Sequence, residues 1–275
     1  MIGDRFFAGI DVGTTTTKAV IVDTKKEIVG SFVRRSGADL TFAATKAYEQ
    51  ALLQAGVPRD AVEAIVATGY GRKSVPFADD SKTEIASHGY GCSFYYREAI
   101  TVVDIGGQDS KIIKLDPQGK CIGFKMNRKC AAGTGAFMEE IAHKLDIPVG
   151  NLNGLAQQAG TAAKIGSYCT VFTATEVLDR IRAGEKTGEI VRGLFDSVTK
   201  RIMEMDTLVG RVVMTGGLVA YNETLAELLS ARAKVKVEIA PHPQEMGAFG
   251  AALFAAEMRR GAELQGDRKT LAAES

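Results

Sequence analysis

The 275-residue sequence lacks a Walker-type phosphate loop of the form G-x-x-x-x-G-K-[ST], and it lacks the run of roughly 18 apolar residues that a membrane-spanning helix needs. It has no excess of one charge either, because 34 Lys and Arg are balanced by 33 Asp and Glu. A chain with almost no net charge has no long-range electrostatic attraction to nucleic acid or to an anionic membrane. The opening residues also lack the features of a secretory signal. We therefore expect a cytoplasmic globular protein with no membrane or nucleic-acid partner.

Cysteine is scarce as well. The chain contains Cys92, Cys121, Cys130 and Cys169. Their spacings match no zinc-binding pattern, and four cysteines are too few for a disulfide scaffold, so reduced thiols are the default expectation. Any further role must be argued for each cysteine separately.

Two parts of the sequence begin with the same pattern, GIDVGTTTTKAVIV at 9–22 and VVDIGGQDSKIIKL at 102–115. Each has an apolar run that ends in Asp-x-Gly, then a polar turn, then a strand that contains a lysine. Three residue types fall in register: Asp11 with Asp104, Gly13 with Gly106, and Lys18 with Lys111. The repetition predicts an internal duplication in which each half opens with an antiparallel meander. After the first meander, apolar spacing predicts a helix from Leu40 that stops at Gly56.

Glycine turns at strand ends can bind phosphates without a Walker loop. They expose backbone N–H groups to phosphate oxygens, threonine hydroxyls at 14–16 add donors, and each aspartate can hold magnesium directly or through water. The segment TGG at 215–217 is a third place where glycines allow the backbone to come close to a nucleotide. One Asp-x-Gly turn alone is more often an ordinary hairpin, but the duplication shifts the balance toward a nucleotide site.

The order of these motifs resembles the superfamily of actin, sugar kinases and heat-shock chaperones. The resemblance implies an α/β, actin-like ATPase (ribonuclease H-like) fold, in which two duplicated lobes with mixed sheets surround a cleft for ATP or ADP with Mg²⁺. We expect lobes at 1–97 and 98–262, with the last helix able to pack back on the first lobe, and a polar tail at 263–275.

The same resemblance implies a set of site residues. Those matching the nucleotide segments are Asp11, Gly13, Thr14, Thr15 and Lys18 in the first loop, Asp104, Gly106, Gly107 and Gln108 in the second, Gly133, Thr134 and Gly135 after the second meander, and Gly216 and Gly217 beside the adenosine. Within this set, Asp11, Asp104 and Gln108 are the catalytic candidates, and the two aspartates are the magnesium candidates.

Two cysteines precede predicted helices. Cys130 comes before apolar residues of helical spacing at 137–145, and Cys169 comes before a second such run at 177–181. A helix N-terminus stabilises a thiolate, and the two cations before Cys130 act in the same direction. Two thiolates are half of the set that a 4Fe-4S cluster usually takes, and a two-fold dimer would supply four. From spacing alone, buried free cysteines remain the stronger alternative.

Four segments together narrow the resemblance: TGYGR, DIGGQDSK, KCAAGTGAF and CTVFTATEV. They resemble the BadF/BadG/BcrA/BcrD ATPase family, which includes activators of 2-hydroxyacyl-CoA dehydratases and ATPase subunits of benzoyl-CoA reductase. The resemblance implies that Cys130 and Cys169 of two subunits hold one 4Fe-4S cluster per dimer. It also implies that ATP hydrolysis drives a low-potential electron to an acyl-CoA dehydratase or reductase, with ferredoxin or flavodoxin as the donor. The dimer is expected to be a homodimer or a pseudo-symmetric heterodimer with a paralogous subunit.

One departure from the sequence pattern of the activators leaves other functions open. Activators tend to carry two acidic residues after the second cysteine, whereas this chain has Ala174 at the first position and Glu176 at the second. A reductase subunit is the first alternative. A small-molecule kinase of the same fold without a cluster, and a nucleotide-switched scaffold protein, are the others. Cys92 and Cys121 match no family ligand and are expected to be structural.

The remaining polar candidates are weaker. His88 and His143 are each expected to be solvated or locally bonded rather than to act as a base, and His242 is expected in a loop. Glu139 and Glu140 are adjacent on a predicted helix and so point in different directions, which places them on a solvated face.

Overall fold

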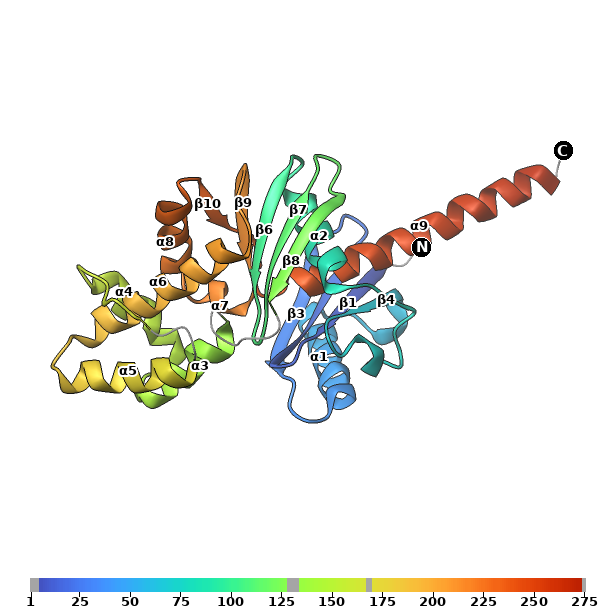
Figure 1. Cartoon of the computed structure of the whole chain (residues 1–275). Helices are drawn as coiled ribbons and strands as arrows, with labels where there is room; N and C mark the ends of the chain where they lie inside the picture. Colours follow the sequence, from blue (N-terminus) through green and yellow to red (C-terminus); the bar gives the residue numbers. More distant parts are fainter. Residues whose placement is uncertain (1–4, 128–133, 167–169, 274–275) are drawn as a thin grey trace. The chain divides into compact units, whose positions relative to one another are not determined.

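The computed structural model describes residues 5–127, 134–166 and 170–273 (Figure 1). Tertiary contacts divide the chain into two units. The first comprises Met1–Tyr95 with Glu245–Ser275, and the second is Tyr96–Gln244. Within the described residues no helix is both long and apolar enough to cross a membrane.

The first unit is built on a five-stranded mixed sheet of order β3-β2-β1-β4-β5. Its strands are β1 (Phe6–Val12), β2 (Thr16–Val22), β3 (Ile28–Arg35), β4 (Val62–Thr68) and β5 (Asp80–Ser81). The first three strands form an antiparallel meander, and β4 runs parallel to β1. Its helices are α1 (Leu40–Ala55), α2 (Glu84–Tyr95) and α9 (Met246–Ala273).

Helices α1 and α9 cover opposite faces of this sheet. Ala8 and Ile10 of β1 pack in one core with α1, whereas Gly9, which points to the other face, lies so close to α9 that an added Cβ would be 1.9 Å from the carbonyl oxygen of Ala248. Helix α1 begins at the side chain of Asp39, which accepts from the N–H of Phe42 at 2.9 Å, and ends at a left-handed Gly56, as the sequence predicts.

The second unit repeats this topology in the order β10-β9-β6-β7-β8. Its strands are β6 (Ile100–Ile105), β7 (Ser110–Leu115), β8 (Cys121–Asn127), β9 (Arg211–Thr215) and β10 (Val237–Ile239). Strands β6 to β8 form the meander, and β9 runs parallel to β6. Its helices are α3 (Gly135–Lys144), α4 (Leu152–Gln158), α5 (Thr170–Arg182), α6 (Thr187–Met205), α7 (Gly217–Ala220) and α8 (Thr224–Ala233). The matching strand orders confirm the duplicated α/β fold.

The unit boundaries differ from the sequence expectation at the C-terminal end. The second unit ends at Gln244 rather than at 262, because the whole of α9 belongs with the first unit and packs on β1 and β4. The helix continues to Ala273, through the segment that was expected to be a polar tail.

Candidate functional site

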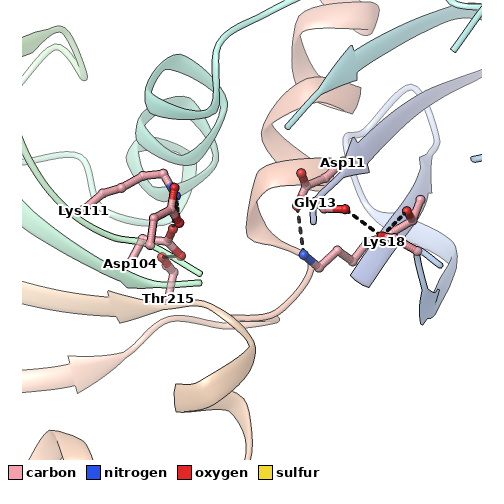
Figure 2. A network of polar contacts seen from close by, with 9 residues as sticks. Asp11, Gly13, Lys18, Asp104, Lys111 and Thr215 are labelled. Carbon is pink, nitrogen blue, oxygen red and sulfur yellow. Dashed lines mark hydrogen bonds and ion pairs between the residues drawn. The ribbon is translucent and has the colours of Figure 1, made fainter. Parts of the chain in front are cut away.

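In the first unit, a buried carboxylate lies near the end of the central strand β1. Asp11 pairs in register with Lys18 of β2 and with Thr68 of β4. The Nζ of Lys18 donates to Oδ2 of Asp11 at 3.1 Å (Figure 2). Gly69 follows Thr68 with a φ of 91°, and a Cβ there would lie 2.5 Å from Oδ1 of Asp11. Glycine is therefore required at 69, both by its backbone conformation and by the carboxylate beside it.

The second unit holds the same set at the equivalent positions. Asp104 of β6 pairs in register with Lys111 of β7 and with Thr215 of β9. Its Oδ2 accepts from Nζ of Lys111 at 3.1 Å, and its Oδ1 accepts from the hydroxyl of Thr215 at 3.1 Å (Figure 2). Gly216 has a φ of 104°, and a Cβ there would lie 2.9 Å from Oδ1 of Asp104. An Asp, a Lys, a Thr and a Gly thus recur around each central strand.

A tight turn follows each aspartate. We call residues 13–16 the first phosphate loop and residues 106–109 the second phosphate loop. The N–H of Gly13 donates to the carbonyl of Thr16 at 3.1 Å, and the N–H of Gly106 donates to the carbonyl of Asp109 at 2.9 Å. The turns therefore have the same closure, as the sequence repeat predicts.

The first phosphate loop is held from behind by Ser36, a buried residue that sequence reasoning missed. Its hydroxyl donates to the carbonyl of Gly13 at 2.6 Å and lies 2.9 Å from the hydroxyl of Thr17. Its N–H donates to the carbonyl of Thr15 at 3.0 Å. Nothing in the local pattern RRSG marks this serine, because its role depends on where β3 ends relative to the loop.

The two aspartates fit a magnesium ion by donor chemistry, since Mg²⁺ is bound in nucleotide sites by one or two carboxylates and the substrate phosphates. Asp104 already accepts a hydrogen bond on each oxygen, which favours contact through water. Lys111 also donates to Asp109 at 2.7 Å, so one buried cation serves two carboxylates. Gln108 is exposed in the second phosphate loop.

The double glycine expected beside the adenosine lies at the start of α7. The N–H of Gly216 donates to the carbonyl of Pro243 at 2.8 Å, and a Cβ on Gly217 would lie 3.4 Å from Nε2 of Gln244. The hydroxyl of Tyr221 donates to Oε1 of Gln244 at 3.0 Å, and the Tyr221 ring is exposed. The double glycine and the exposed ring of Tyr221 therefore lie close together, because Gly217 and Tyr221 both approach the side chain of Gln244.

Part of the predicted set lies outside the described residues, namely Cys130, Cys169 and Gly133. Thr134 is the buried N-cap of α3, and Gly135 is the first residue of this helix. Gly135 is a predicted nucleotide contact, and its N–H donates to the carbonyl of Gly106 in the second phosphate loop at 2.9 Å.

Of the other cysteines, Cys92 is buried in α2 and Cys121 is exposed at the start of β8, and neither forms a disulfide within the described residues. His143 and His242 are exposed, and Glu140 pairs with Lys144 on the surface of α3, as expected.

His88, which was expected to be solvated or locally bonded, is buried. It is 6% exposed on α2, and a Cβ on Gly247 would lie 2.8 Å from its Nε2 and 3.2 Å from Oδ2 of Asp11. The imidazole and the carboxylate therefore flank the same small space at the start of α9. The sequence could not show this, because the two residues are brought together by the packing of α2 and α9 over β1.

The departure at position 174 has a packing explanation. Ala174 is 7% exposed and belongs to the core of the second unit. Glu176 carries the polar contacts of this helix, since its carboxylate accepts from the N–H of Gly166 at 2.9 Å and from Nη2 of Arg180 at 2.9 Å. A small apolar residue suits the first position, and the acid at the second secures the segment before α5.

Comparison with known proteins agrees with this geometry. The BadF/BadG/BcrA/BcrD ATPase family matches residues 8–255, which includes both phosphate loops, both Asp-Lys pairs and the double glycine. The chain belongs to this ATPase family. Its relatives include an activator of lactoyl-CoA dehydratase from Anaerotignum propionicum, 40% identical over 252 residues, which cover 90% of this chain and 96% of the relative.

Two further relatives, one of known structure, are similar to this chain over most of its length. The structure of the activator of 2-hydroxyisocaproyl-CoA dehydratase from Clostridium difficile with bound ADPNP matches with a TM-score of 0.89 at 33% identity, covering 95% of this chain and 98% of that one. A benzoyl-CoA reductase subunit from Thauera aromatica is 31% identical over 262 residues, which cover 90% of this chain and 92% of the relative.

Proposed function

We propose that this ATPase hydrolyses MgATP to deliver a low-potential electron to an acyl-CoA dehydratase, as an activator of the 2-hydroxyacyl-CoA dehydratase type. The observation that carries the nucleotide part is the repeated set of a buried Asp-Lys pair beside a glycine loop, once in each unit. In each set, the loop N–H groups suit the phosphate oxygens of a magnesium–nucleotide complex, and the carboxylate suits the metal ion.

The residues of each set have separate tasks in this proposal. Asp11 and Asp104 hold Mg²⁺, Asp104 through water, and the loop amides bind phosphate oxygens. Lys18 and Lys111 orient these carboxylates and offset their charge when no nucleotide is bound. Gln108 orients the attacking water. Positioning and electrostatic stabilisation of this kind account for most of the acceleration of phosphoryl transfer.

Cys130 and Cys169 are the residues proposed to hold a 4Fe-4S cluster, with two thiolates from each subunit of a two-fold dimer. The cluster would store and pass on one electron at low potential. The proposal for these two residues is supported by their sequence context and by the names of the relatives. A ferredoxin or flavodoxin is the proposed donor.

The activator type is favoured over a reductase subunit by similarity. The lactoyl-CoA dehydratase activator is 40% identical to this chain, whereas the benzoyl-CoA reductase subunit from Thauera aromatica is 31% identical. The burial of Ala174 shows how the chain accommodates its departure from the usual acid. We therefore propose a homodimer that meets its acceptor transiently rather than half of a stable complex.

The test is anaerobic purification followed by iron, sulfide and ATPase assays. We expect about four irons per dimer, lost in both Cys130→Ala and Cys169→Ala, and ATP hydrolysis that stays in both variants. Cys92→Ala is the matched control and should keep its iron. Iron-free wild-type protein with full ATPase activity after anaerobic reconstitution would contradict the cluster but not the nucleotide site. Tight copurification with other reductase components would instead favour the reductase alternative.

A further inference from the structure

The second phosphate loop rests on the first turn of helix α3. The N–H of Gly135 donates to the carbonyl of Gly106 at 2.9 Å, and the N–H of Ala136 donates to the carbonyl of Gly107 at 2.7 Å. These two residues open the helix, where N–H groups have no acceptor inside the helix itself. The loop supplies those acceptors, so two segments that are distant in sequence are joined by backbone hydrogen bonds.

This contact decides which way the loop amides point. The C=O and N–H of a trans peptide point in opposite directions. Because the carbonyls of Gly106 and Gly107 point to α3, the N–H groups of the next residues, Gly107 and Gln108, are turned away from it. These are the amides that the proposed nucleotide site needs for phosphate oxygens. The first turn of the helix therefore orients the amides that are proposed to bind phosphate.

Close packing makes the contact stiff. A Cβ on Gly135 would lie 3.3 Å from the carbonyl oxygen of Gly106 and 3.4 Å from Cα of Gly107, so an alanine here would be tight against the loop backbone, which would have to shift by a few tenths of an ångström. Immediately after this turn, Phe137, Met138 and Ile141 are buried in the core of the second unit. Well-packed cores transmit small displacements rather than absorbing them.

We propose that Gly135 and Ala136 are positioning residues of the second phosphate loop, and that α3 senses the β- and γ-phosphates of the nucleotide through them. The inference rests on the proposed nucleotide site and adds its route of regulation. Cys130, which is proposed to hold the cluster, lies five residues before Gly135 in the sequence. The first phosphate loop is held instead by the side chain of Ser36, which directly follows β3.

Hydrogen exchange tests the route in the unmodified protein. Wild-type protein is compared with and without MgADP and the magnesium complex of the non-hydrolysable analogue ADPNP. Binding is first measured directly by titration. We expect slower exchange in peptides covering 106–110 and also in peptides covering 134–138, by about threefold or more, and no change in α8. Protection of the loop with an unchanged α3 would overturn the inference and leave the nucleotide site intact.

Substitution gives the second test, and the lack of tryptophan makes a clean reporter possible. His143 is exposed on α3, so His143→Trp places the single tryptophan of the chain on this helix. Nucleotide should change its emission. Adding Gly135→Ala should remove most of that change and raise the nucleotide Kd about fivefold to tenfold.

Gly154→Ala is the matched control, because a Cβ at this position of α4 meets nothing within 4 Å. It should leave both the emission change and the Kd as in the reporter parent. If Gly135→Ala and Gly154→Ala behave alike, the inference is wrong. If the wild type binds no nucleotide at all, the proposed function fails together with it.

Discussion

The two units carry the same set of polar residues, but the phosphate loop beside each set is held in place by different contacts. Each carries an Asp, a Lys, a Thr and a Gly around the central strand of an equivalent sheet, and each closes its phosphate loop with the same turn. The first phosphate loop is supported by one serine side chain, whereas the second is supported by the amides of a helix. The residues that would meet the nucleotide are thus the repeated part, while the support of each loop belongs to its own unit.

The threonines of the two sets show a similar contrast. The hydroxyl of Thr215 donates to Asp104 at 3.1 Å, while in the described residues the buried hydroxyl of Thr68 has no hydrogen-bond partner. Lys111 binds two carboxylates and is 3% exposed, while Lys18 is 13% exposed. The second set is therefore the more tightly bonded of the two.

The largest expected effect comes from removing either carboxylate charge. Asp11→Asn and Asp104→Asn keep the shape of the side chain but weaken the hold on magnesium, so each should lower ATP turnover about 100-fold. The measurement is steady-state hydrolysis at saturating MgATP, with Asp116→Asn, in an exposed turn, as the control. Two similar losses mean that both sets serve one reaction. Near-normal turnover in either variant would contradict the prediction that the aspartates of both units are needed for ATP hydrolysis.

The next effect separates the two lysines. Lys111→Met leaves two carboxylates without their buried cation and should cost about 3–5 kcal/mol of unfolding free energy. Lys18→Met should cost less, because this pair is closer to solvent. Denaturant unfolding measures both. Adding Asp104→Asn to Lys111→Met should recover part of the loss. Equal costs for the two lysine variants would contradict the proposed difference in bonding.

A smaller effect is expected behind the first phosphate loop. Ser36→Ala removes the hydrogen bond to the carbonyl of Gly13 and should raise the KM for ATP about threefold to tenfold, with a stability cost of about 1–2 kcal/mol. Ser93→Ala, which removes a hydroxyl bonded to the carbonyl of Tyr90 within α2, is the matched control and should leave the KM unchanged. A KM for Ser36→Ala equal to that of Ser93→Ala would show that Ser36 does not position the loop.

The smallest effect concerns the edge of the second sheet. The hydrogen bond from Arg211 lowers the pKa of Glu238. The resulting stabilisation is present above the unfolded pKa of about 4.3 and is lost as the pH falls through the lower folded pKa. Glu238→Gln should therefore cost under about 1 kcal/mol at neutral pH, and its melting temperature should approach that of the wild type below about pH 4. A constant difference across this range would show that the ion pair is not its cause.

Much of the geometry at the proposed nucleotide site followed from the sequence because it is local. Asp11, Gly13 and Lys18 recur at the same spacing as Asp104, Gly106 and Lys111, and a strand, a glycine turn and a second strand bring such residues together whatever surrounds them. Extending the repeat would also have found Gly69, since ATG at 67–69 and MTG at 214–216 end equivalent strands.

Only the tertiary structure showed what supports the two loops. Ser36 meets Gly13 across 23 positions, Gly135 meets Gly106 across 29, and the imidazole of His88 is brought to Asp11 by a helix near the other end of the chain. Periodicity and turn chemistry carry no information about such pairs, because they depend on strand register, on where a strand ends and on how closely helices pack. The sequence by itself determined the repeated set of Asp, Gly and Lys in each unit, because these residues are neighbours along a strand, a turn and the next strand. The tertiary structure decided how each loop is held in place, because those contacts join segments that are distant in the sequence.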